Sequence, residues 1–115
     1  MSIGYLELVS TNPDSVCEAY SKIHGVEFSG PIPELGNARV ISLPEGGRLG
    51  VRGQLRPDET PVVRPYVLVD DVAAAIEVAR EAGAEIALGE TEIPGQGTFG
   101  IFIHGGIESG VWQRD

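Results

Sequence analysis

The pattern of hydrophobic and polar positions occurs twice along this chain. In the first copy, residues 4–10 form a mostly apolar extended run, and a helical pattern follows that is capped at Thr11 or Asn12. The apolar positions of that helix are spaced i, i+3, i+4 and i+7, and they are Val16, Ala19, Tyr20 and Ile23. This spacing places apolar side chains on one side of a helix. The first copy therefore predicts a strand followed by an amphipathic helix.

The second copy begins about half a chain later. A strand is predicted over residues 64–69, and a helix follows from Asp71. Its apolar positions repeat the same spacing, and they are Val72, Ala75, Ile76 and Ala79. Each helical pattern ends near a glycine, Gly25 in the first copy and Gly83 in the second. Because one strand–helix unit cannot bury its own sheet face, the two copies are expected to share one core.

Short strands and turns are predicted for the rest of each copy. The strands expected after the first helix are 26–28, 38–43 and 48–52, the last two joined by a turn over 44–47. The strands expected after the second helix are 84–88, 99–103 and 109–112. Residues 55–63 are polar with two prolines and form the expected linker. The chain is interpreted as one domain made of module one (about 1–54), the linker, and module two (about 64–115).

Composition narrows the class of protein. A chain of 115 residues with 42% hydrophobic residues can form one globular domain. The net charge of −9 argues against nucleic acid and anionic membranes as partners, because both require basic surface. No apolar run is long enough to cross a bilayer and no signal-peptide pattern opens the chain, so a cytoplasmic location is expected. A single cysteine, Cys17, excludes an internal disulfide framework and a multi-cysteine zinc site.

Four segments carry a more specific pattern. They are YLELVSTNPD at 5–14, PYVLVDDV at 65–72, EIPGQG at 92–97 and GVWQ at 110–113. In their order and spacing around the internal repeat they resemble the vicinal oxygen chelate superfamily, which includes glyoxalase I, the extradiol dioxygenases, and the bleomycin and fosfomycin resistance proteins. The resemblance covers essentially the whole chain. It implies an α+β fold of two tandem βαβββ modules, whose curved mixed sheet surrounds a cavity and carries the helices on its outer face.

The resemblance also indicates where a metal would bind. Metal-dependent members hold a divalent ion with His, Glu or Gln on the first and last strands of each module, and those positions fall here at Tyr5, Gly50, Arg64 and Gly110. Glycine offers no side-chain ligand, and the arginine cation repels a metal ion. A tyrosine phenol must lose its proton before it binds well. The chain is therefore interpreted as a metal-free branch of the superfamily that uses no cofactor.

Candidate ligand-binding residues follow from the alternation of side chains along a strand, which puts residues two apart on one face. The side chains expected to line the cavity are Tyr5, Glu7, Arg52, Arg64, Tyr66 and Trp112. Glu7, Tyr66 and Trp112 are expected to converge although they come from both modules. Aromatic walls with a few charged groups are typical of small-molecule sites. The arginines between positions 39 and 64 suit an anionic group on the ligand.

Structural roles for the same residues stay open at this point. Glu7 could pair with an arginine across the sheet and hold the modules together. Trp112 and the tyrosines could fill a closed core, and the arginines could form a solvated strand face. Of the two histidines, His24 ends a helix, where a cationic side chain suits the helix dipole. His104 is the histidine that could perform acid–base chemistry.

The predicted function is reversible binding of a small molecule, aromatic or anionic, by a metal-independent protein of this superfamily. The alternative is a metal-independent lyase or isomerase in which Glu7 acts as the base and Arg52 or Arg64 stabilises a developing anion. A metal-dependent lyase or dioxygenase is disfavoured by the four positions without ligands. Small members of the superfamily usually pair, so a homodimer is expected. Whether the chain is an enzyme stays open.

Overall fold

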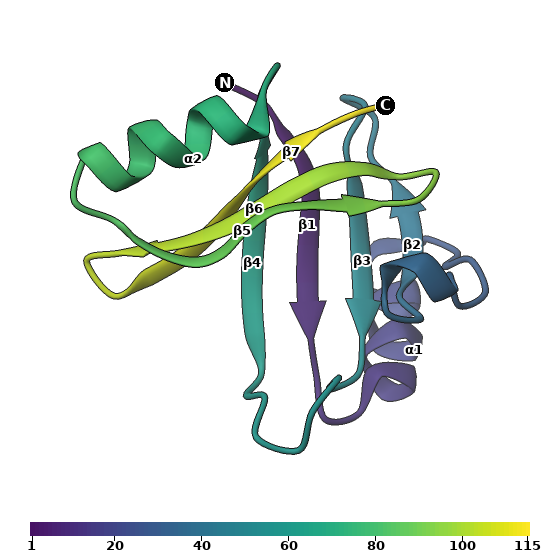
Figure 1. Ribbon diagram of the computed structural model, residues 1–115. Helices are drawn as coiled ribbons and strands as arrows, with labels where there is room; N and C mark the ends of the chain where they lie inside the picture. Colours follow the sequence, from purple (N-terminus) through teal and green to yellow (C-terminus); the bar gives the residue numbers. More distant parts are fainter. The chain divides into compact units, whose positions relative to one another are not determined.

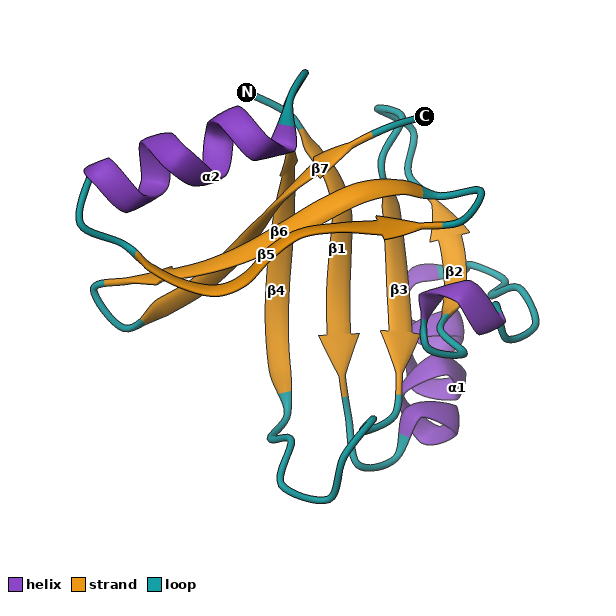
Figure 2. Cartoon of the chain, viewed as in Figure 1, coloured by secondary structure: helices purple, strands orange, loops and turns teal.

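The computed structural model describes all 115 residues, and the chain divides into two compact units. The first unit comprises residues 5–63, and the second combines residues 1–4 with residues 64–115. Each unit contains one α-helix and part of a mixed β-sheet, as the purple and orange elements of Figure 2 show. This arrangement confirms the α+β class predicted from the sequence. No helix is long and apolar enough to cross a membrane.

Three strands form the sheet of the first unit, in the order β2-β3-β1. They are β1 (Ile3–Val9), β2 (Arg39–Ser42) and β3 (Arg48–Arg52). β1 and β3 run parallel, with Glu7 opposite Gly50, whereas β2 and β3 are antiparallel. The hairpin predicted between β2 and β3 is confirmed. The parallel pair places the first and last strands of the unit side by side, which brings residues distant in sequence together.

The helix of the first unit, α1 (Pro13–His24), begins and ends with the expected signals. The side chain of Asn12 accepts a hydrogen bond from the backbone N–H of Ser15, and Pro13 occupies the first turn, where its missing N–H costs nothing. Gly25 ends the helix with φ of 64°, a left-handed conformation that glycine adopts without strain. The helix packs on the sheet through a small core of Leu8, Cys17 and Val51.

The strand expected at 26–28 is absent, and this prediction was wrong. The segment has no regular structure; it runs alongside β2 and is joined to it by a hydrogen bond from the N–H of Ser29. Beyond Pro31, which lacks a backbone donor, the pairing is limited to one antiparallel bridge between Ile32 and Ala38, and a short 3₁₀ helix, η1 (Pro33–Leu35), follows. Phe28 nevertheless packs against the α1 core, which accounts for the apolar pattern that suggested a strand.

Four strands form the sheet of the second unit, in the order β4-β7-β6-β5. They are β4 (Val62–Leu68), β5 (Glu85–Ile93), β6 (Gly97–His104) and β7 (Ile107–Gln113). β4 and β7 run parallel, with Tyr66 opposite Gly110, and the other pairs are antiparallel. The second unit thus repeats the parallel pairing of first and last strands seen in the first unit. β5 is longer than the predicted 84–88, and its register with β6 shifts between Ile86 and Leu88 and again between Leu88 and Thr91.

The helix α2 (Val72–Glu81) lies against β5, β6 and β7 in the second unit (Figure 1). Its N-terminus is capped by Asp71, whose carboxylate accepts a hydrogen bond of 3.1 Å from the N–H of Ala74. Val72, Ile76 and Val111 form the core beneath it. Because these side chains occupy the helix side of the sheet, the alternate residues of β4 and β7 face away from α2.

Candidate functional site

In the first unit, three of the predicted site residues lie on the sheet face opposite α1. Leu8 on β1 and Val51 on β3 point into the α1 core. Side chains alternate along a strand, so Tyr5, Glu7 and Arg52 lie on the other face. All three are buried, with exposed fractions of 3%, 8% and 6% respectively. The parallel pairing of β1 with β3 is what brings these residues together.

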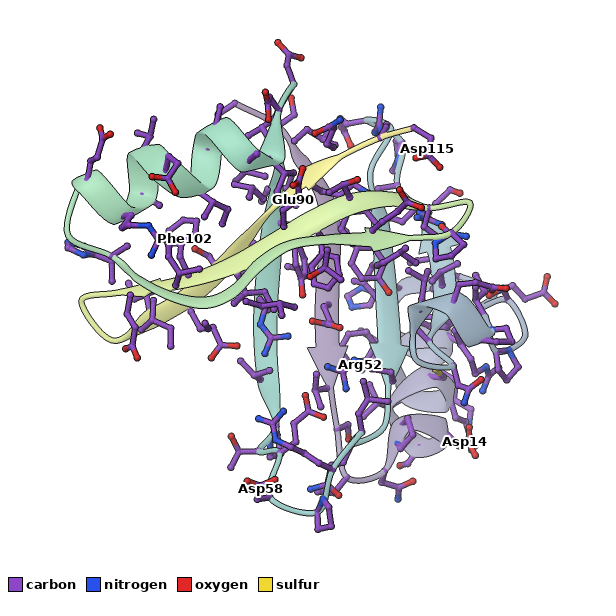
Figure 3. The ribbon with its side chains drawn as sticks, viewed as in Figure 1. Asp14, Arg52, Asp58, Glu90, Phe102 and Asp115 are labelled. Atoms are coloured by element: carbon purple, nitrogen blue, oxygen red, sulfur yellow. The ribbon has the colours of Figure 1, made fainter.

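Arg52 is the centre of a buried ion-pair network, and Figure 3 labels its side chain beside β3. Its Nε donates to Glu7 Oε2 at 2.8 Å. Its two terminal nitrogens donate to the two carboxylate oxygens of Glu59 at 2.9 and 2.8 Å. The pairing of Glu7 with an arginine across the sheet, one of the structural alternatives, is therefore observed. Both partners belong to the first unit, so the pair stabilises that unit.

The close contacts shift the ionisation of the network. The hydrogen bonds from Arg52 outweigh the effect of burial and lower the pKa of Glu59 to about 2. Burial acts to lower the pKa of Arg52, but the hydrogen bonds and charges of Glu59 and Glu7 raise that pKa above its ordinary value. Glu59 and Arg52 therefore stay charged across the whole physiological pH range.

Glu59 was not among the residues predicted from the sequence. It lies in the loop formed by residues 53–61, within the segment interpreted as a polar linker. Its Oε1 also accepts a hydrogen bond of 2.8 Å from the N–H of Leu55, and its carbonyl accepts one of 2.6 Å from the side chain of Gln54. A lone glutamate in a polar segment carries no periodic signal, so the sequence offered nothing that distinguishes it from its exposed neighbours.

Tyr5 covers the backbone of Gly50 on the same face. A Cβ atom built on Gly50 would overlap the phenol oxygen of Tyr5, so the ring occupies the space that a side chain at position 50 would need. The guanidinium of Arg48 lies over the Tyr5 ring, 5.7 Å from its centroid. Burial, reinforced by the negative charge of Glu7, raises the pKa of Tyr5 to about 12. The phenol is therefore neutral at physiological pH.

In the second unit, an aromatic cluster lies on the sheet face opposite α2. Tyr66 meets Trp112 edge to face, with ring centroids 5.5 Å apart and planes at 88°. Phe99 on β6 stacks on Trp112 at 5.8 Å and 29°, and it meets Tyr66 edge to face at 5.9 Å. The indole N–H of Trp112 donates to the carbonyl of Gln96 at 3.0 Å, which fixes the orientation of the ring.

Phe99 was missed although a signal for it existed. It lies opposite Trp112 in the β6–β7 pairing, and the strands containing both residues were predicted. Residues directly opposite one another on paired strands share a face, so the predicted hairpin places Phe99 on the same face as Trp112. The cluster defined by Tyr66, Phe99 and Trp112 is called the aromatic face below.

Arg64 belongs to the same strand face as Tyr66 and forms an ion pair in the second unit. Its Nε donates to Glu108 Oε1 at 2.7 Å, and a second guanidinium nitrogen contacts the same carboxylate. Arg64 is 7% exposed, whereas the Glu108 side chain is about one-third exposed. The Tyr66 ring covers Gly110, where an added Cβ would overlap ring carbons. The relation of Tyr5 to Gly50 in the first unit thus recurs here.

The structure therefore groups the six predicted residues into two sets, one in each unit. Tyr5, Glu7 and Arg52 form the first set, and Arg64, Tyr66 and Trp112 form the second. The expectation that Glu7 and Trp112 converge on one cavity stays a prediction. The two histidines belong to neither set: His24 meets the Tyr20 ring edge to face on α1, and His104 is exposed at the end of β6.

The four positions that would hold a metal in the superfamily do not fit one here. Gly50 and Gly110 have no side-chain donors, and tyrosine rings fill the space beside them. Arg64 is a cation already paired with Glu108. Tyr5 is the remaining position, and a phenol with a pKa of about 12 binds a divalent ion poorly because its proton is hard to remove. No group of three or more His, Cys, Asp and Glu side chains comes together elsewhere.

No protein-family model and no curated protein matches the sequence of this chain. Solved structures do match. The hypothetical protein BH1468 from Bacillus halodurans is 10% identical, with a TM-score of 0.78 over 99% of this chain and 94% of its own. A methylmalonyl-CoA epimerase from Streptomyces coelicolor, in complex with 2-nitronate-propionyl-CoA, is 16% identical, with a TM-score of 0.72 over 97% and 96%.

A third similar structure is the NAD-dependent benzaldehyde dehydrogenase from Legionella pneumophila, which is 14% identical with a TM-score of 0.71 over 96% of this chain and 98% of its own. Identities this low show a shared fold and nothing about shared chemistry. The likeness spans nearly the whole of each chain, and it shows that this chain has the fold of the vicinal oxygen chelate superfamily.

Proposed function

We propose that this protein binds a small organic molecule reversibly and without a divalent metal, using the aromatic face as its apolar contact surface. The observation that carries the proposal is the geometry of Tyr66, Phe99 and Trp112. Their rings meet at 5.5 to 5.9 Å on one side of the sheet, away from the α2 core. Aromatic side chains with few rotatable bonds give a large contact area at low entropic cost.

The surroundings of the aromatic face suit a ligand with an aromatic or other flat apolar part. The hydrogen bond from Trp112 to the Gln96 carbonyl holds the indole ring in place before any ligand arrives. Phe99 is only partly buried, so one ring of the cluster retains accessible surface. A rigid apolar surface loses little freedom when it binds, and its contacts therefore contribute more fully to affinity.

The proposal that binding needs no metal rests on the chemistry of the residues at the four metal positions. The superfamily's four metal positions are occupied by two glycines, an ion-paired arginine and a neutral phenol, Tyr5. A ligand would therefore be held by aromatic contacts and by charged side chains of the protein. Resistance proteins of the superfamily act in this manner, by sequestering a molecule that they do not change.

Calorimetric titration tests this proposal. The probes are benzoate, benzamide and propionyl-CoA, which share apolar parts but differ in charge. Trp112→Ala should weaken the binding of a bound probe by about 1–3 kcal/mol through lost apolar contact. Tyr20→Ala on α1 is the control and should leave affinity unchanged. If none of the probes binds with a Kd below about 1 mM, or if the Trp112 variant binds as well as the parent, the aromatic face is not the contact surface.

A second candidate function is a metal-independent isomerase with Glu7 as base. The fold similarity to methylmalonyl-CoA epimerases favours it, because epimerisation requires removal and return of a proton at one carbon. Glu7 is a buried carboxylate whose orientation is fixed by Arg52, and it faces away from α1 beside the neutral phenol of Tyr5. A carboxylate held in this way could accept a proton from a bound substrate.

Proton exchange separates the two candidates. An isomerase of this type should exchange the α-proton of methylmalonyl-CoA with deuterium oxide, which NMR detects directly. Glu7→Gln should then slow exchange by about 100-fold or more while binding persists, and Glu18→Gln on the exposed side of α1 should have no effect. Exchange no faster than that of the free thioester would assign the protein to binding alone.

A further inference from the structure

We propose that the guanidinium of Arg52 is a binding site, within the first unit, for the carboxylate of a small organic acid, and that Glu59 occupies this site in the ligand-free protein. The inference goes beyond the aromatic face, because it concerns residues of the first unit alone, and it names the ligand class, a carboxylic acid anion. Glu59 acts as an internal carboxylate supplied by the loop of residues 53–61. An external carboxylate would take its place on Arg52, and the loop would move outward.

The geometry of the Arg52–Glu59 pair is the geometry in which arginine binds a free carboxylate. Two parallel hydrogen bonds of 2.9 and 2.8 Å join the two terminal nitrogens to the two oxygens. Such paired contacts are stronger and more directional than a single ion pair. The two hydrogen bonds to Arg52 need only a carboxylate, whereas the further bond from the N–H of Leu55 to Glu59 Oε1 belongs to the closed loop. The site is therefore preformed on a strand, β3, and filled by a residue from a loop.

The loop is attached to the first unit mainly through the side chain of Glu59. Residues 54–58, 60 and 61 are all exposed, whereas Glu59 is 7% exposed. Asp58 lies at the outer end of the loop, where Figure 3 labels it, and pairs with Arg56 on the surface. Leu55, the one large apolar residue of residues 54–61, is 64% exposed and anchors the loop weakly. Outward movement of the loop would thus uncover little apolar surface.

The exchange of one carboxylate for another leaves the charge of the buried network unchanged. Arg52 is paired with two carboxylates, from Glu7 and Glu59. Removing Glu59 without replacement would leave the buried cation with a single carboxylate partner, Glu7, which is unfavourable. A ligand carboxylate restores both hydrogen bonds and the charge, so the loop opens at low cost only when an anion of this type is present. Selectivity for carboxylates over neutral amides follows, because an amide oxygen cannot accept both hydrogen bonds in the same manner.

Chemical rescue tests the site directly. Glu59→Ala removes the carboxylate that the Arg52 guanidinium binds. Acetate should then bind to Arg52 and raise the melting temperature of the variant by several degrees relative to chloride at equal ionic strength. Asp58→Ala removes an acid from the same loop but leaves Glu59 on Arg52, so acetate should not raise its melting temperature more than chloride does. If acetate stabilises the two variants equally, the carboxylate site is refuted. Glu59→Gln, which keeps the size of the side chain, serves the same test if Glu59→Ala does not fold.

Affinity for an aromatic acid gives the second measurement. Glu59→Gln should bind benzoate about tenfold or more tightly than the parent, because the internal competitor has lost its charge, whereas affinity for benzamide should not change. Equal benzoate affinity in the two proteins would overturn the inference. If Trp112→Ala weakens both probes equally while Glu59→Gln changes neither, only the carboxylate site fails. If acetate rescues Glu59→Ala while Trp112→Ala has no effect, only the aromatic face fails.

Discussion

The phenol ring of Tyr5 lies over Gly50 so closely that no side chain at position 50 could coexist with it. Tyr66 stands in the same relation to Gly110 in the second unit. In both units a tyrosine on the first strand fills the space beside a glycine on the last strand, and these strands run parallel and adjacent. The internal repeat is therefore preserved in three dimensions as a tyrosine–glycine pair on the face away from each helix.

Substituting these glycines should reveal how tightly the tyrosines are held. Gly50→Ala should destabilise the protein by about 1–3 kcal/mol, because Cβ would displace the buried Tyr5 ring. Gly110→Ala should have a comparable cost through Tyr66. Gly89→Ala on β5 is the control, since no atom lies within 4 Å of the position of its Cβ. Urea unfolding measures all three, and a Gly50 variant as stable as the Gly89 variant would contradict the packing described.

The Arg52–Glu59 pair should make stability depend on acid pH. The pKa of Glu59 is lowered from 4.5 to about 2 in the folded protein. A lowered pKa contributes stability that is fully present above pH 4.5 and is lost as pH falls toward 2. Glu59→Gln should therefore be less stable than the parent at neutral pH and should lose less stability between pH 5 and about pH 2. If the stability of the two proteins falls equally between pH 5 and about pH 2, the Arg52–Glu59 pair does not contribute to the pH dependence of stability.

Tyr5 should make the stability of the protein depend on pH at the alkaline end of the range. Its pKa is raised from 10.0 to about 12 on folding, mainly by burial. A raised pKa gives stability that is complete below pH 10 and is lost as pH rises toward 12. Tyr5→Phe should flatten this alkaline loss and remove from the ultraviolet absorbance curve a phenol that titrates near pH 12. Tyr20→Phe on α1 should leave the alkaline loss in place, and an unchanged loss in Tyr5→Phe would contradict the assignment.

Much of the fold could be predicted because its sequence signals are local and occur in both copies of the repeat. Caps at Asn12 and Asp71 and the stripe of apolar residues after each fix both helices. The strand expected at 26–28 failed because a short apolar run cannot by itself distinguish a paired strand from a segment that packs one ring, Phe28, against a helix. Pro31 and Pro33 lack backbone donors, and the pairing after this segment is limited to the single bridge between Ile32 and Ala38.

The candidate site could be predicted only where alternation along regular strands applies. Tyr5, Glu7 and Arg52 share a face for this reason, and so do the residues of the aromatic face that lie on β4 and β7. Glu59 lies in an irregular loop, and its position depends on a turn that brings it back onto Arg52. The alternation of side chains along a strand gives no information about a residue in such a loop. The pairing of Glu7 with an arginine was anticipated, but Glu108 as the partner of Arg64 was not, since sequence shows which charges exist and tertiary structure decides which of them meet.

The fluorescence of Trp112, the chain's single tryptophan, tests metal-independent binding on the aromatic face most directly. Benzoate and propionyl-CoA are titrated once with a chelator present and again with added zinc, nickel or manganese. Ligand addition should shift the Trp112 emission to the same extent in each buffer, with dissociation constants that agree within about twofold. A shift that vanishes in the chelator and returns with a metal ion would contradict metal-independent binding.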